Sequence, residues 1–270
     1  MRMGCMISLV LVISMLGYEP VVAETEKPRE AASRPASQPA SQPAGGFKIA
    51  ADEQIVAMGD SITQAGGYLK VMDAVFAQQY PDLRIPKIIN VGIGGQKAED
   101  MVARFEKDVI ARKPGIVTIS VGINDVWHLL DKPHDPAVLE AYGRNVERMV
   151  KMAQDAGVKV IILSPTVIQE DPASEGNKRL KLYVRAGRQI ARERRCAYVD
   201  LHEMFLKVIE KNRARKPEQG ASASDDHLTT DGVHMAPMGD TLMAVGVLRA
   251  LGVPDEKIGA TDLSEVFKKK

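Results

Sequence analysis

The chain has 270 residues, which is enough for one large domain whose core needs neither disulfides nor metal ions in order to fold. Its 36 Lys and Arg residues almost balance its 35 Asp and Glu residues, and the formal net charge of +1 argues against a nucleic-acid-binding surface. Two cysteines exclude a disulfide framework, and 4% aromatic residues are too few for an extended stacking surface for single-stranded nucleic acid or polymeric sugar. The composition favours a globular protein with a small-molecule site.

The first 23 residues have the pattern of a secretory signal peptide. Arg2 precedes the uncharged apolar run 6–16, and small residues at 21–23 offer a cleavage site before Glu24. A membrane anchor would need about 20 apolar residues, and residues 17–20 interrupt this run too early. We therefore expect a secreted or periplasmic protein that has no stable membrane insertion after the signal is removed.

Residues 24–47 predict a disordered spacer. The unit Pro-Ala-Ser-Gln occurs twice in tandem, and a segment of this composition buries too little apolar area to offset the entropy that it loses on ordering. We predict that the folded domain covers residues 48–256 and that residues 257–270 form a C-terminal tail.

Between residues 54 and 251, short apolar runs alternate with amphipathic stretches. The predicted strands are 54–58, 87–91, 116–121, 158–163 and 197–201, and the predicted helices are 68–79, 98–111, 137–156, 177–195, 203–211 and 238–251. Continuous β-branched runs separated by helices are typical of a parallel sheet that is covered on both faces. The sequence therefore predicts an α/β fold, a doubly wound three-layer α/β/α sandwich with a five-stranded parallel sheet.

Ligands of such folds bind at the carboxyl ends of the strands, and polar motifs follow three of the predicted strands. Ser61 stands in the sequence Gly-Asp-Ser-Ile-Thr directly after the first strand, on a turn that exposes its hydroxyl at this edge; helix capping by Asp60 or Ser61 is the alternative. Glycines at 92, 94 and 95 follow the second strand and permit a backbone N–H to face an anion, or else form an ordinary turn. Asn124 follows the third strand and either turns its amide toward the same point or serves a tight turn.

A fourth motif precedes the last predicted helix. In Asp231-Gly232-Val233-His234, an aspartate three residues before a histidine can reach one ring nitrogen and fix the tautomer, so that the other nitrogen accepts a proton. A motif of this kind is common and on its own indicates little. Together the four motifs supply a nucleophile, two oxyanion donors and a base with its orienting carboxylate.

These blocks resemble those of the SGNH (GDSL) hydrolases, in the order in which that superfamily carries them. Residues 59–61 match the first block, Gly95 the second, residues 122–125 the third and residues 231–234 the last, so that the resemblance covers about residues 52–252. It implies the flavodoxin-like SGNH hydrolase fold and a serine esterase that needs no cofactor and no metal.

The resemblance also implies the role of each residue. Ser61 would attack an ester carbonyl, His234 would carry the proton, and Asp231 would orient His234. The oxyanion would be bound by the Ser61 N–H, the Gly95 N–H and the Asn124 side chain. Asp60 and Trp127 are predicted to contact substrate, although Trp127 is equally suited to core packing.

The substrate prediction rests on the residues around the third block. Residues 104–108 and 122–127 look like those of bacterial acetylxylan esterases and related carbohydrate deacetylases of the superfamily, which implies a small ester substrate, an acetylated saccharide. A lysophospholipase, thioesterase or arylesterase is the alternative within the superfamily, and a non-catalytic glycan-binding module lies outside the enzyme class. A metal hydrolase that uses residues 225–227 as ligands is a further alternative, and self-association is compatible with the sequence.

Overall fold

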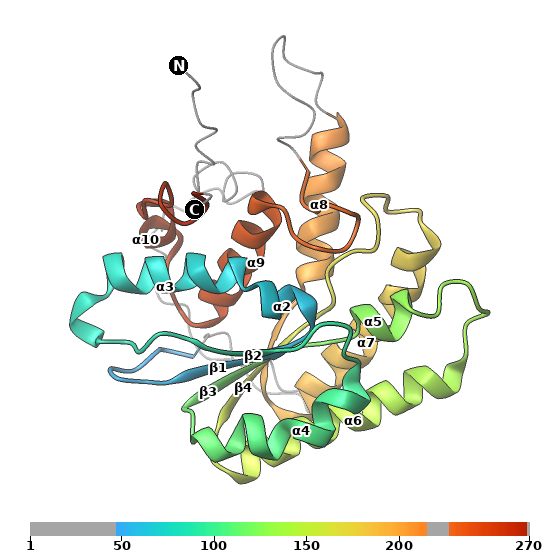
Figure 1. Ribbon diagram of the computed structural model, residues 1–270, viewed down its shortest axis with the longest axis horizontal. Coiled ribbons are helices and arrows are strands. Elements are labelled where there is room, and N and C mark those ends of the chain that lie inside the picture. The colour runs from blue at the N-terminus through green and yellow to red at the C-terminus, as the bar shows by residue number, and fades with distance from the viewer. Residues whose placement is uncertain (1–46, 215–226, 269–270) are drawn as a thin grey trace, which may run out of the picture.

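The computed structural model describes residues 47–214 and 227–268, which form an open parallel sheet between two layers of helices (Figure 1). The strands are β1 Ile55–Gly59, β2 Ile89–Gly92, β3 Ile116–Ser120, β4 Lys159–Leu163 and β5 Ala197–Val199. Neighbouring strands are parallel, and their order across the sheet is β2-β1-β3-β4-β5. The predicted five-stranded parallel sheet is confirmed.

The central strands are buried along their whole length because both of their faces are covered, and most of their residues are apolar. Every residue of β1 and β3 is buried, and Val56 pairs in register with Ile89 on one side and Val117 on the other. From β1 the chain crosses to one side for β2 and then to the other side for β3. The reversal lies at the carboxyl ends of β1 and β3, which is the place where ligands of doubly wound folds bind.

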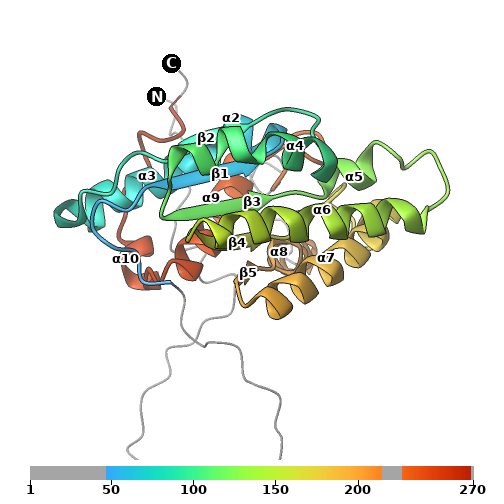
Figure 2. The ribbon, with the colours of Figure 1, turned by 90° about the horizontal axis from the view of Figure 1, so that it is seen from below.

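Helices cover both faces of the sheet (Figures 1 and 2). The long helices are α3 Gly67–Gln79, α4 Ala98–Asp108, α6 Pro136–Asp155, α7 Glu175–Arg194, α8 Leu201–Ala214 and α9 Pro237–Ala250. One layer contains α3, α9 and α8, and the other contains α4, α6 and α7. All six helices lie where they were predicted, with ends that differ by a few residues.

Three short helices and two 3₁₀ turns were not predicted. They are α2 Ser61–Ala65, α5 Ile123–Trp127, α10 Asp255–Gly259, η1 Pro81–Leu83 and η2 Ile110–Arg112. A helix of five residues is too short to show a 3.6-residue periodicity, so the sequence indicates only a turn. Two of them, α2 and α5, begin directly at the carboxyl ends of β1 and β3 and carry candidate site residues.

The predicted C-terminal tail is wrong for its described part, residues 257–268. Ile258 and Leu263 are buried in the core. The Gln78 side chain of α3 also donates to the Asp262 carbonyl and accepts from the Asp262 N–H, each at 2.9 Å. The apolar residues here are too few and too irregularly spaced to indicate packing, yet the segment completes the layer that contains α3 and α9.

The predicted signal peptide and nearly all of the predicted spacer lie outside the described residues. Phe47, the last spacer residue, packs against the core and donates from its backbone N–H to the Ala250 carbonyl at 3.0 Å. Within the described residues, no helix combines the length and the apolar character needed to cross a membrane.

Candidate functional site

Ser61 lies at the point where β1 turns into α2. Asp60 is the N-cap of α2, and its Oδ1 accepts the Ile62 N–H at 3.0 Å. The cap makes Ser61 the first helical residue, at a position where backbone N–H groups have no partner within the helix. The half-buried Ser61 side chain therefore stands at the carboxyl edge of the sheet, beside its own backbone N–H, for which the described residues provide no acceptor.

The structure brings Ser61, His234 and Asp231 together. His234 Nε2 lies 2.9 Å from Ser61 Oγ, and His234 Nδ1 lies 2.7 Å from Asp231 Oδ2. A carboxylate only accepts hydrogen bonds, so Nδ1 carries the imidazole proton and Nε2 is left to accept the Ser61 hydroxyl proton. In this arrangement a histidine can take the proton of a serine that becomes a nucleophile.

Asp231 organises the turn that carries His234. Its Oδ1 accepts the backbone N–H groups of Val233 at 3.0 Å and His234 at 2.8 Å, so that one carboxylate holds both the ring and the backbone of the histidine. Gly232 adopts φ 93°, which a residue with a Cβ rarely does. Its carbonyl accepts the Gln169 N–H at 2.7 Å, which fastens the turn to the segment after β4.

A second carboxylate fixes the start of this segment. Glu170 Oε1 accepts the N–H groups of Leu228 at 2.8 Å and Thr229 at 2.7 Å and the Thr229 hydroxyl at 2.7 Å. The turn that carries His234 is thus attached to the body of the domain by several hydrogen bonds.

The charge of Asp231 is stable. The hydrogen bond to His234 is the main cause that lowers the pKa of Asp231 to about 2, with the backbone N–H groups of His234 and Val233 acting in the same direction. The carboxylate therefore stays ionised at mildly acidic and neutral pH, where it stabilises a protonated imidazole.

The glycine-rich loop after β2 lies against α2. A Cβ on Gly92 would stand 2.3 Å from the backbone nitrogen of Gln64, so only glycine allows this close approach. Gly95 has φ 76°, and among the described residues its N–H has no hydrogen-bond acceptor. Gly94, by contrast, donates its N–H to Gln64 Oε1 at 3.0 Å, which orients the loop. The loop thus leaves one N–H, that of Gly95, available to a ligand.

Asn124 lies in α5, at the carboxyl end of β3. Its side chain is 1% exposed, and its Nδ2 donates to the backbone carbonyl of Gln96 at 3.0 Å. The amide has a second Nδ2 hydrogen, which is available to a ligand. The structure therefore ties α5 to the glycine-rich loop.

The predicted substrate contact of Asp60 is not supported. Asp60 is 1% exposed, and its carboxylate caps α2, the role that the sequence offered as the alternative. Burial raises its pKa to about 6, against the Ile62 N–H and the charge of His234, which lower it. The side chain lies beneath the surface, where it shapes the turn that presents Ser61.

Asp125, next to Asn124, is a buried carboxyl whose ionisation reduces stability. Both of its oxygens lie 3.4 Å from the Ala98 N–H, and burial raises its pKa to about 7, against Ala98 and Lys97, which lower it. Between about pH 4 and 7 the folded protein therefore binds more protons at this site than the unfolded chain does, so the free energy of unfolding falls as pH rises through that window.

We expect Asp125→Asn to reduce this pH dependence. The melting temperature of the variant should fall less between pH 5 and pH 8 than that of the wild type. Because the pKa of Asp60 is also raised, Asp60 makes stability fall as pH rises in both proteins, so some pH dependence remains in the variant. Thermal unfolding at both pH values measures the effect, with the exposed Asp131→Asn as the matched control. If the melting temperature of the Asp125→Asn protein fell between pH 5 and pH 8 by as much as that of the wild type, the expectation would be contradicted.

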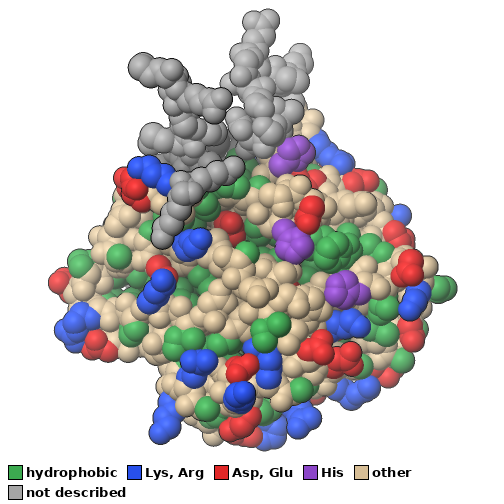
Figure 3. All heavy atoms as spheres, viewed as in Figure 1, with side chains coloured by type: hydrophobic (Ala, Val, Ile, Leu, Met, Phe, Trp, Pro, Cys, Tyr) green, Lys and Arg blue, Asp and Glu red, His purple; other side chains and the backbone are tan. Residues whose placement is uncertain are grey.

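Trp127 stands at the rim of the site and not in the core. Its side chain is 36% exposed, and its ring meets the His234 ring edge-on at a centroid distance of 5.9 Å and the His128 ring at 5.7 Å. On the face shown in Figure 3, histidine side chains border exposed hydrophobic side chains, among charges of both signs. This exposure is at odds with the core-packing alternative for Trp127, and its contact with substrate stays a prediction.

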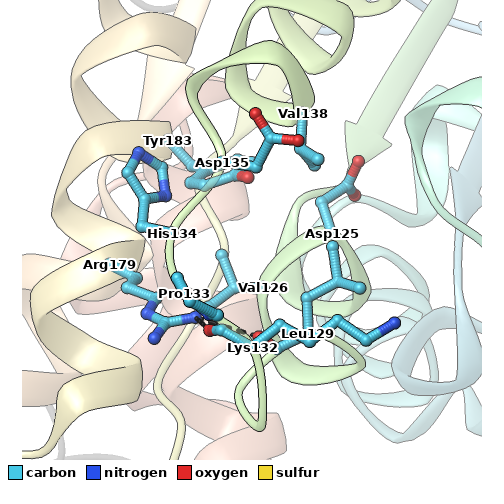
Figure 4. Close-up of a pocket in the computed structure, with 10 residues that line it drawn as sticks. All are labelled: Asp125, Val126, Leu129, Lys132, Pro133, His134, Asp135, Val138, Arg179 and Tyr183. Atoms are coloured by element: carbon cyan, nitrogen blue, oxygen red, sulfur yellow. Dashed lines mark hydrogen bonds between the residues drawn. The ribbon is translucent and has the colours of Figure 1, made fainter.

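A separate pocket of about 250 Å³ lies between α5, α6 and α7 (Figure 4). Its lining includes Asp125, Lys132, His134 and Tyr183, and the Arg179 guanidinium reaches across to donate to the carbonyls of the loop after α5. None of the described residues that line it is Ser61, Gly95, Asn124, Asp231 or His234. The pocket therefore adjoins α5 but is not part of the site around Ser61.

Of the alternative metal ligands, only His227 is described. Its Nδ1 lies 3.4 Å from Glu170 Oε2, a carboxylate already engaged by backbone N–H groups, while Asp225 and Asp226 lie outside the described residues. Within the part of the chain that the structure describes, no three His, Cys, Asp or Glu side chains are grouped as metal ligands.

Sequence reasoning missed the polar residues that hold the site in place. They are Gln64, Gln96, Arg104 and Glu170, which hydrogen-bond to the backbone or side chains of the site loops. Isolated glutamine and glutamate residues give no sequence signal for such contacts. The structure also pairs Arg104 with Asp108, one helical turn further along, at 2.9 Å, and this i,i+4 spacing is a sequence signal that could have indicated the ion pair.

Comparisons with known proteins agree with the resemblance drawn from the sequence and confirm the fold class. Residues 57–241 match the model of the GDSL-like Lipase/Acylhydrolase family. An acetylxylan esterase of Geobacillus stearothermophilus is 29% identical over 224 residues, which cover 76% of this chain and 97% of that protein. A Bacillus subtilis (strain 168) protein described as an uncharacterized lipoprotein, YqeF, is 27% identical over 221 residues, 72% of this chain and 88% of that protein. The crystal structure of Axe2, an acetylxylan esterase from G. stearothermophilus, matches with a TM-score of 0.66 at 28% identity and covers 77% of this chain and 98% of that one.

Proposed function

Because the chain belongs to the GDSL-like lipase/acylhydrolase family and is a carboxylic ester hydrolase, we propose that Ser61, His234 and Asp231 carry out the hydrolysis. The observation that carries this proposal is the continuous pair of hydrogen bonds from Asp231 through His234 to Ser61, at 2.7 and 2.9 Å. Residues 173 positions apart in the sequence meet at the carboxyl edge of the sheet, where the fold places ligands.

In the first half of the reaction, Ser61 becomes acylated. Its Oγ attacks the ester carbonyl carbon while the hydroxyl proton passes to His234 Nε2. The carbonyl oxygen becomes an oxyanion, which accepts hydrogen bonds from the N–H groups of Ser61 and Gly95 and from the Asn124 amide. The tetrahedral intermediate then expels the alkoxide, which takes the proton from the imidazolium and leaves as an alcohol. Asp231 stabilises the imidazolium throughout.

In the second half, water removes the acyl group. His234 Nε2 accepts a proton from water, the hydroxide attacks the acyl carbon, and the same three donors bind the second oxyanion. Collapse of this intermediate breaks the bond to Oγ, which regains its proton from His234. The acid leaves and the enzyme is restored, in two steps that call for no cofactor or metal.

Asn124→Ala tests the assignment of the oxyanion donors. We expect kcat to fall about a hundred- to a thousandfold while KM changes little, because the amide binds charge that develops only in the transition state. Steady-state kinetics on a short acyl ester measure the effect, and Asn145→Ala on α6 is the matched control. A folded Asn124→Ala protein with full turnover would remove Asn124 from this role.

We propose an acetylated saccharide as the substrate. The relatives described as acetylxylan esterases match nearly along their whole length. The exposed Trp127 ring next to His234 offers a flat apolar surface on which a sugar ring can stack while the ester lies at Ser61. Ile93, beside the glycine-rich loop, is a second exposed hydrophobic side chain near the site.

The substrate proposal is tested by comparing acyl donors. Acetate release from acetylated xylo-oligosaccharides should exceed cleavage of a lysophospholipid, an aryl ester and an acyl thioester at equal concentration. The Ser61→Ala protein supplies the background for each substrate. Faster cleavage of any of the other three esters would assign the chain to that alternative class, and the absence of acetate from acetylated glycans would overturn the carbohydrate proposal.

We also propose that the enzyme acts outside the cytoplasm. The pattern of residues 1–23 and the lipoprotein description of the B. subtilis relative support this location. Expression of the full chain in a bacterial host should yield a mature protein in the periplasm or medium that begins at Glu24, as measured by mass spectrometry. An uncleaved protein confined to the cytoplasm would contradict the proposal.

A further inference from the structure

Gln96 lies where the three structural parts of the site meet. It follows Gly95 in the glycine-rich loop, its backbone carbonyl accepts the Asn124 amide, and its side chain reaches Arg104 on α4. We infer that Gln96, held by Arg104, is a positioning residue that aims the Asn124 amide at the oxyanion. The inference rests on the proposed function, because it concerns how the same site is organised.

The direction of the Asn124 amide depends on the Gln96 carbonyl. The amide group is planar, so its two Nδ2 hydrogens point in fixed relative directions. One of them is directed at the Gln96 carbonyl at 3.0 Å, the single hydrogen bond that the described residues offer to this side chain. The other hydrogen therefore points where the position of Gln96 sends it. A shift of the Gln96 carbonyl would turn the amide with it.

The glycine-rich loop alone does not fix Gln96. Two of the three residues before it are Gly94 and Gly95, and its own N–H makes only a long contact of 3.4 Å with the Ile93 carbonyl. Glycines permit many backbone conformations, so a loop of this composition needs support from outside. The Gly94 N–H has Gln64 as its partner, but this contact lies on the other side of Gly95.

Arg104 supplies the support for Gln96. Its Nε donates to Gln96 Oε1 at 2.6 Å, a charge-assisted hydrogen bond of the stronger kind. The same guanidinium donates to the carbonyl of Val91 at 2.7 Å, at the end of β2, and to that of Gly59 at 3.4 Å, at the end of β1. The Arg104 side chain is 13% exposed and is paired with Asp108. Arg104 thereby connects Gln96 to the ends of β2 and β1. The contact on β1 is Gly59, the residue just before Asp60 and Ser61.

Gln96→Met tests the inference, because methionine keeps the length of the side chain and removes its acceptor. We expect kcat to fall about ten- to a hundredfold, since displacement of a catalytic group by about 1 Å has an effect of that size, while KM stays within about twofold. Gln154→Met on α6 is the matched control, because it removes the side-chain amide of a glutamine whose hydrogen bond, to the Arg194 carbonyl, lies outside the site. Gln96→Ala is a second variant in case the longer side chain disturbs folding.

A double variant separates positioning of Asn124 from a general structural effect. In the Asn124→Ala background, the factor by which Gln96→Met lowers kcat should be at least about three times smaller than in the wild type, because the group that Gln96 aims is gone. Equal factors in the two backgrounds, or no loss in the wild type, would overturn the inference. The Ser61→Ala protein keeps this result distinct from failure of the proposed function: hydrolysis that does not depend on Ser61 would overturn the proposed function itself, whatever Gln96 does.

Discussion

Ser61→Ala is expected to lower kcat about a millionfold, to the level that binding and oxyanion contacts sustain without a nucleophile. Among the described residues, Ser61 Oγ hydrogen-bonds only to His234, so its removal leaves α2, the glycine-rich loop and the Asp231–His234 pair in place. Turnover should therefore vanish while substrate binding persists. Steady-state kinetics on a short acyl ester would measure the loss of turnover. A thermal unfolding curve would show that the variant is still folded.

Covalent labelling provides a second readout of the same variant. A fluorophosphonate reacts with an activated serine through phosphorus and loses fluoride, so the mass of its phosphonyl group should appear on the peptide that contains Ser61 in the wild type and on no peptide of the Ser61→Ala protein. Ser264→Ala, an exposed serine beyond α10, is the matched control and should retain full turnover. A folded Ser61→Ala enzyme with more than a hundredth of wild-type turnover would remove Ser61 as the nucleophile.

Asp231→Asn is expected to lower kcat about ten thousandfold with the geometry of the turn preserved. Asn keeps an oxygen for the Val233 and His234 N–H groups but loses the charge that holds the Nδ1 proton in place and stabilises the imidazolium. Since the pKa of Asp231 is lowered to about 2, the wild type keeps this charge at every pH at which a folded enzyme would be assayed. The defect should therefore be present across the neutral pH range.

Asp262→Asn is the matched control for this change. Asp262 also accepts a backbone N–H two residues ahead, that of Ser264, but it has no histidine partner. The kcat of this control should stay within about twofold of wild type, whereas Asp231→Asn should lose nearly all turnover at unchanged melting temperature. Retention of a tenth of wild-type turnover by Asp231→Asn would rule out the orienting role.

The fold was predictable because most of its strands stand out in the sequence as continuous apolar runs. The runs at 116–121 and 158–163 contain almost only β-branched and aliphatic residues, as buried parallel strands require. Helix ends were less accurate, because they depend on caps such as Asp135 and Ser174, whose side chains accept N–H groups that only the tertiary arrangement reveals. The C-terminal segment was missed because packing, and not periodicity, orders it.

The sequence located the residues that the structure brings together but not the residues that support them. Ser61 and Asn124 follow predicted strands and His234 precedes a predicted helix, so each lies beside a recognisable element. Asp60 could not be assigned, because an aspartate before a helix caps it or contacts substrate with the same sequence signature, and only its burial decides. Gln96 and Glu170 act through backbone groups of distant segments, which leave no local pattern.

The proposed nucleophile and its proposed base come from opposite ends of the domain sequence, the first on the first turn of α2 and the second on the turn before α9. A chain whose synthesis stops before residue 227 contains all five strands and Ser61, yet it lacks both His234 and the α9 helix that packs on α3. Under the proposed function, chains that end before His234 should therefore be inert, whatever structure they acquire. Turnover would then require translation at least through α9.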